Sequence, residues 1–65
     1  MDVLVNGEKR QLAAATLAEA LVALDFEEVV VATALNGAFV PKRKRAETRL
    51  ADGDRIEIVA PRQGG

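Results

Sequence analysis

The chain has 65 residues and a formal net charge of −1, with 49% hydrophobic and 29% charged residues. These values are typical of one small globular domain with a compact apolar core, and not of a disordered or fibrous chain. Cysteine and histidine are both absent, which excludes disulfides, thiol nucleophiles, the common zinc sites and histidine acid–base chemistry. We therefore expect a protein that is not an enzyme and that binds no cofactor or metal itself.

The apolar runs are far shorter than the roughly 20 residues that a membrane-spanning helix needs. The N-terminus, Met1-Asp2, lacks the basic and then apolar pattern of a signal peptide. These observations predict a cytoplasmic protein with no membrane partner.

The chain begins with a predicted hairpin. Val3-Leu4-Val5 is a β-rich run, and Asn6-Gly7 tolerates the positive φ of a two-residue turn. The polar segment 8–12 then returns as an edge strand, whose charges discourage pairing with other chains.

A helix is predicted next. Thr16 and Glu19 have the spacing of a capping box, in which each side chain satisfies a free backbone donor at the helix start. Four apolar residues share one helical stripe that must pack on a sheet: Leu17, Ala20, Leu21 and Leu24. We expect the helix to end near Asp25 and Phe26 to fold back into the core.

The second half of the chain predicts three strands. The first covers 29–35 and is followed by a second Asn-Gly pair, after which 38–40 returns as a short strand. Pro41 ends that strand because it has no backbone N–H for the ladder. Asp52-Gly53-Asp54 is a turn that opens into the last strand, 55–59, whose alternation buries Ile56 and Ile58.

This order of elements predicts an α+β fold, a mixed sheet of four to five strands with one helix packed across one face. Residues 1–60 form the domain, and 61–65 follow it as a flexible tail, because they have no apolar side chain to dock and end in two glycines.

Lys42-Arg43-Lys44-Arg45 is the only cluster of like charge. We interpret it as a solvated basic turn or a docking patch for an acidic protein surface. A nucleic-acid site is the less favoured interpretation, since Phe26 and Phe39 are the only aromatic residues and stacking platforms are missing.

The ending Gly64-Gly65 has a chemical interpretation. A terminal carboxylate is ionised at neutral pH and can attack the α-phosphate of ATP when a partner enzyme binds both, which gives an acyl-adenylate. Glycine adds no side-chain bulk where the backbone enters a narrow site. Sulfur attack on the adenylate then leaves a thiocarboxylate. Simple fraying or a truncated chain explains many such endings equally well.

The chain resembles the ThiS family, the ubiquitin-like β-grasp sulfur carriers of thiamine biosynthesis. Four ordered segments carry the resemblance: Val5-Asn6-Gly7; Ala34-Leu35-Asn36-Gly37 running into Val40-Pro41; Leu50-Ala51-Asp52-Gly53-Asp54; and Ile56-Glu57-Ile58-Val59 before Gly64-Gly65. The chain departs from the family's pattern after Pro41, where no aromatic residue precedes Leu50.

The resemblance implies a β-grasp sheet with the last strand in the centre beside the first. It implies that Gly65 is the residue adenylated and converted to the thiocarboxylate, and that Gly64 threads into the enzyme. The implied partners are a ThiF-like adenylating enzyme that uses ATP with Mg²⁺, a sulfur donor protein and a ThiG-like thiazole synthase.

Strand alternation places Glu57 and Val59 on the face away from the helix. We expect Val59, Phe39 and Ala34 to form the apolar part of a partner-binding face, although ordinary core or edge packing explains each of them as well. Arg62 and Gln63 are further candidate contacts, and Arg62 is either a steering charge or simply solvated.

Three other interpretations remain open. A molybdopterin synthase small subunit shares the fold and the Gly-Gly end but delivers sulfur to a pterin. Another ubiquitin-like sulfur carrier or protein modifier is the second. The third is a β-grasp nucleic-acid-binding or adaptor module that uses the basic cluster and needs no free carboxylate.

Overall fold

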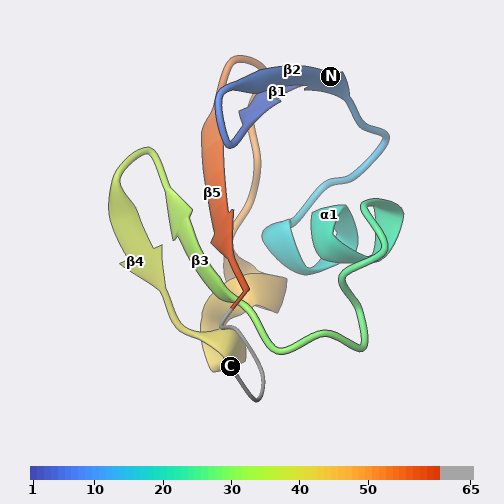
Figure 1. The fold of residues 1–65 in the computed structure, drawn as a ribbon. Helices are drawn as coiled ribbons and strands as arrows, with labels where there is room; N and C mark the ends of the chain where they lie inside the picture. Colours follow the sequence, from blue (N-terminus) through green and yellow to red (C-terminus); the bar gives the residue numbers. More distant parts are fainter. Residues whose placement is uncertain (61–65) are drawn as a thin grey trace.

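The computed structural model describes residues 1–60, and the predicted tail over 61–65 lies outside the described residues. Figure 1 shows a twisted sheet with one short helix packed against it. The elements in chain order are β1 (Asp2–Val5), β2 (Glu8–Gln11), α1 (Leu17–Ala23), β3 (Ala32–Leu35), β4 (Ala38–Val40), the 3-10 helix η1 (Lys42–Glu47) and β5 (Arg55–Val59).

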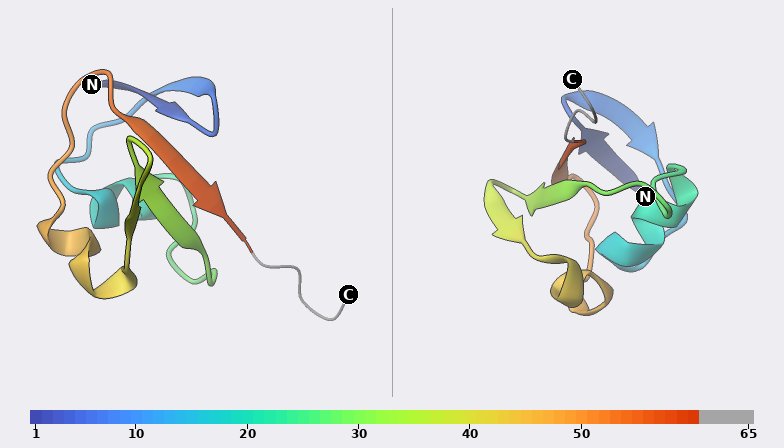
Figure 2. Two further views of the ribbon diagram at one scale, coloured as in Figure 1. Left: turned by 90° about the vertical axis from the view of Figure 1, so that its left-hand side faces the viewer. Right: turned by 60° about the horizontal axis from the view of Figure 1, so that its bottom comes forward.

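The sheet has five strands in the order β2-β1-β5-β3-β4. β5 pairs in parallel with β1, with Leu4 opposite Arg55 and Val5 opposite Ile56, and it pairs antiparallel with β3. β5 therefore lies in the centre of the sheet with β1 and β2 on one side and β3 and β4 on the other (Figure 2). The last strand lies beside the first, as expected for a β-grasp fold.

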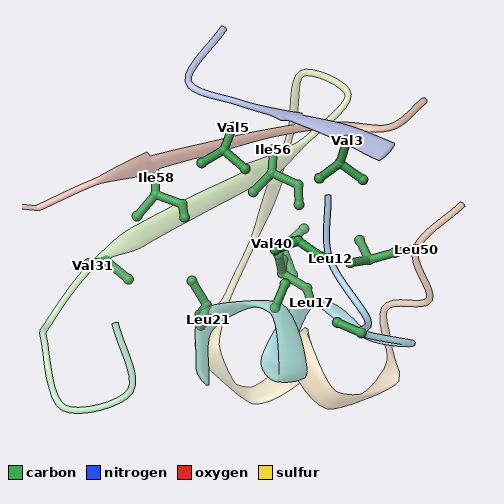
Figure 3. Close-up of a cluster of buried hydrophobic side chains, with 12 residues drawn as sticks. Val3, Val5, Leu12, Leu17, Leu21, Val31, Val40, Leu50, Ile56 and Ile58 are labelled. Carbon is green, nitrogen blue, oxygen red and sulfur yellow. The ribbon is translucent and has the colours of Figure 1, made fainter. Parts of the chain in front are cut away.

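The core lies between the inner face of the sheet and α1 (Figure 3). Leu17 on α1 and Ile56 on β5 are fully buried, because the helical stripe and the strand alternation point at each other. The other large apolar side chains of this cluster are Val3, Val5, Leu12, Leu21, Val31, Val40, Leu50 and Ile58.

Both ends of α1 follow the sequence prediction. The Thr16 hydroxyl accepts a hydrogen bond from the Glu19 N–H at 3.2 Å, and the Glu19 carboxylate accepts one from the Ala15 N–H at 2.8 Å. The helix ends at Ala23, Asp25 takes a φ of 67°, and Phe26 packs half-buried against the core. The capping residues thus fix where the short helix begins.

The predicted strand over 29–35 is wrong in its first three residues. β3 begins only at Ala32, which is paired with Val59, the last residue of β5. Residues 29–31 have no β5 partner beyond that point, and Val30 is 73% exposed. The β-rich run 29–35 therefore extends past the end of β5, the strand with which it pairs.

The basic cluster is not a solvated turn throughout. Its residues form η1, and Arg45 is buried at 9% exposure. The Arg45 guanidinium donates to the Thr33 hydroxyl at 3.0 Å and to the Val31 carbonyl at 2.7 Å. The Thr33 hydroxyl in turn donates to the Val40 carbonyl at 2.8 Å. Arg45 therefore joins η1 to the chain entering β3, while Lys42, Arg43 and Lys44 stay exposed.

We predict that Arg45→Ala lowers the free energy of unfolding by about 2 kcal/mol, because hydrogen bonds to a charged group are lost and the Val31 carbonyl loses a buried partner. Lys44→Ala, on the exposed side of the same helix, should change it by less than about 0.5 kcal/mol. Urea unfolding followed by far-UV circular dichroism measures both. Equal effects of the two substitutions would contradict the structural role of Arg45.

Candidate functional site

The outer face of the sheet, opposite α1, carries an apolar patch at the end of β5. Phe39 on β4 is opposite Ala34 on β3, and Ala34 is opposite Glu57 on β5. Val59 is opposite Ala32, so the same side of the sheet continues to the last residue of β5. The structure thus brings Ala34, Phe39 and Val59 together, and we call Ala32, Ala34, Phe39 and Val59 the outer patch.

The outer patch is exposed and slightly hollowed. Phe39 is 70% exposed and Val59 is 64% exposed, which does not fit core packing for either side chain. A groove there is lined by the four patch residues together with Asn6, Gly7, Thr33 and Glu57. Clustered apolar side chains on a solvent-facing surface are typical of binding sites. Contact of these residues with a partner stays a prediction.

The β5 part of this face carries two opposite charges. Arg55 and Glu57 lie with Val59 on the exposed side of β5, and Glu57 is next to Ala34 across the ladder. The apolar patch is therefore bordered along β5 by one carboxylate and, two residues further from Val59, by one guanidinium.

The predicted tail residues Arg62, Gln63, Gly64 and Gly65 lie outside the described residues. Ala60 is the last described residue and directly follows β5. The outer patch is therefore located at the end of the strand from which the tail continues.

Sequence reasoning missed the side-chain roles of two asparagines, which it treated only as turn residues. Both adopt a positive φ, 52° for Asn6 and 51° for Asn36, as the hairpin turns require. Their amides also hydrogen-bond to β5: Asn6 to the main chain of Ile58, and Asn36 to the N–H of Arg55. The signal available in the sequence was that both hairpins carry asparagine at the same turn position.

No group of three or more acidic residues within residues 1–60 lies close enough together to hold a metal ion. Among the helices of residues 1–60, none has the length and the apolar composition of a membrane span.

A mixed sheet with parallel first and last strands at its centre and a helix across one face defines a β-grasp protein. The model of the ThiS family matches residues 3–65, and the chain belongs to this family. The fold matches the crystal structure of the thiamine biosynthesis protein ThiS from Geobacter metallireducens with a TM-score of 0.82, at 29% sequence identity and with 100% of both chains covered.

A segment similar to this chain is part of a longer curated relative. The chain is 39% identical over 66 residues to a thiazole synthase of Paramagnetospirillum magneticum, a match that covers all of this chain. The chain spans only 20% of the length of that relative.

We predict that replacing valine by threonine changes the free energy of unfolding little on the outer face of the sheet and strongly on the inner face. Val59→Thr on the outer patch should change the free energy of unfolding by less than about 0.5 kcal/mol. Val3→Thr has nearly the same shape change, but Val3 is 1% exposed, so the buried hydroxyl should cost about 1 to 3 kcal/mol. Urea titrations of the two variants test this, and a large loss for Val59→Thr would show that the outer patch stabilises the fold.

Proposed function

We propose that the chain is a sulfur carrier whose Gly65 carboxylate is adenylated by a partner enzyme and then converted to a thiocarboxylate. The match to the ThiS family, which extends through residue 65, carries this proposal. In this proposal the chain acts as carrier and substrate rather than as an enzyme, and it works in the cytoplasm together with the partner that uses ATP.

Activation takes place in two steps. A Gly65 carboxylate oxygen attacks the α-phosphorus of ATP, which the activating enzyme binds with Mg²⁺. An acyl–phosphate bond forms, and the bond to the β-phosphate breaks with release of pyrophosphate. Sulfur at the sulfide level then attacks the acyl carbon and displaces AMP, which leaves the thiocarboxylate. In the cell a sulfur donor protein supplies this sulfur.

Glycine at the last two positions suits this chemistry. Gly64 threads through a narrow enzyme channel because it has no side chain and accepts any φ that the channel imposes. Gly65 presents its carboxylate without a Cβ beside the reacting atoms. The carrier then needs no cysteine to hold a nucleophilic sulfur, in agreement with its composition.

The proposed partners are a ThiF-like adenylating enzyme and a ThiG-like thiazole synthase that accepts the sulfur for thiazole formation. The relative from P. magneticum supports the second partner, since a segment similar to this chain is part of a protein named thiazole synthase. The exposed outer patch supports a docking role for Ala34, Phe39 and Val59 toward the activating enzyme. Arg62 and Gln63 contribute further contacts between the patch and Gly64.

Incubation with ATP, Mg²⁺, the cognate adenylating enzyme and sodium sulfide should raise the intact mass by about 16 Da, the replacement of one oxygen by sulfur. Deletion of Gly65 should abolish this change and leave the circular dichroism spectrum unaltered. Before treatment, the protein isolated from cells must have the mass expected for a chain whose last residue is Gly65. No mass change in the presence of an active enzyme would argue for a binding module instead.

Phe39→Ala should raise the KM of the activating enzyme for the carrier about tenfold, because an exposed aromatic anchor at an interface contributes more than most contacts. Val30→Ala is the control, since Val30 is equally exposed, at 73% against 70% for Phe39, but lies before β3 and does not line the groove. Pyrophosphate release at varied carrier concentration gives both KM values. Equal KM values for the two variants would exclude the outer patch as the docking site.

A further inference from the structure

β5 extends beyond the end of β1, the parallel strand that pairs with it. Successive residues of a strand direct their main-chain N–H and C=O groups to alternate sides. The Ile56 carbonyl accepts a hydrogen bond from the Asn6 N–H at 2.9 Å, so the main-chain groups of Ile58 also face the β1 side. β1 ends at Val5, however, and the chain turns away at Asn6-Gly7.

The side chain of Asn6 fills this gap. Its amide oxygen accepts a hydrogen bond from the Ile58 N–H at 2.8 Å, and its amide nitrogen donates one to the Ile58 carbonyl at 3.1 Å. A carboxamide has one acceptor and one donor group in the arrangement of a peptide unit, so it replaces the missing strand residue. Asparagine also tolerates the φ of 52° that the turn imposes.

The two hydrogen bonds hold the final part of β5 from its second side. On the other side, β3 pairs Thr33 with Ile58 and Ala32 with Val59. Ile58 precedes Val59 of the outer patch by one residue and Gly65 by seven. Asn6 thus fixes the main chain close to where it leaves the sheet, beside the groove that Asn6 itself helps to line.

We propose that Asn6 is a positioning residue for activation of the carrier: by holding Ile58 from the β1 side, its amide fixes the direction in which the chain leaves the outer patch toward Gly65. This role rests on the proposed function. When the patch is docked on the activating enzyme, a fixed exit direction leads the chain into the enzyme channel, which then holds the Gly65 carboxylate near the α-phosphorus of ATP. Small displacements of reacting groups lower rates strongly even when binding is intact.

The chain contains a matched control at the opposite end of the same strand. Asn36 also precedes a glycine and has a φ of 51°. Its amide oxygen accepts from the Arg55 N–H at 2.9 Å, and its amide nitrogen donates to the Asp54 carboxylate at 3.0 Å. Asn36 therefore holds the start of β5, away from the exit toward Gly65.

Asn6→Gly and Asn36→Gly test the proposal, because glycine accepts the positive φ of the turn while the side-chain amide is removed. Amide hydrogen exchange followed by NMR should show about tenfold faster exchange at Ile58 in Asn6→Gly, with Arg55 unchanged. Asn36→Gly should show the reverse pattern. This readout requires no partner enzyme.

The kinetic readout is pyrophosphate release with the carrier as the varied substrate. Asn6→Gly should lower kcat about tenfold and leave KM nearly unchanged, since the four apolar residues of the outer patch stay in place but the carboxylate is misplaced. A purely structural role gives a different result, because a partly unfolded carrier lowers only the concentration of the competent form and so raises KM. Asn36→Gly should leave kcat unchanged.

A kcat for Asn6→Gly equal to that of the wild type, or equal losses of kcat in both variants, would overturn the positioning role while leaving the proposed function in place. A rise in KM without a change in kcat would overturn it in the same way. Absence of thiocarboxylate on the wild-type chain overturns the proposed function, and this role with it.

Discussion

The fold depends on pairing β5 along both of its sides. A central strand carries main-chain donors and acceptors that water reaches poorly, and each one left unpaired costs about as much as a lost hydrogen bond. β1 and β3 each cover only part of β5, and asparagine amides complete the pairing, Asn6 at Ile58 and Asn36 at Arg55. The two tight turns therefore reverse the chain and also supply, through their asparagine side chains, hydrogen bonds to β5 that β1 and β3 do not make.

The side chains of β5 point alternately to the two faces of the sheet, and the two sets have different roles. Ile56 and Ile58 point to α1 and complete a core that a domain of this size needs almost whole. Val59 points to the other face, where it remains exposed with Phe39 although burial would stabilise both side chains. An exposed apolar patch next to the exit of the chain agrees with a carrier that is gripped by its body while its end reacts.

Two polar side chains, Thr33 and Arg45, are buried between β3 and η1. Thr33 is 2% exposed, and its hydroxyl links the Arg45 guanidinium to the Val40 carbonyl. η1 is thereby fixed beneath β3 and β4 by directed hydrogen bonds rather than by apolar packing alone. Buried polar groups are stable when every member is satisfied, and within residues 1–60 no buried side-chain nitrogen or oxygen lacks a partner.

Features that depend on near neighbours could be predicted from the sequence: the two Asn-Gly hairpins, the capping box at Thr16, and the burial of Ile56 and Ile58. The ordered segments of the family resemblance also predicted the β-grasp fold. The start of β3, the burial of Arg45 and the partners of the asparagine amides could be seen only in the folded chain, because they depend on residues far apart in the sequence. Asn6 bonds to a residue 52 positions away and Arg45 to one 14 positions away, and no local pattern encodes such partners.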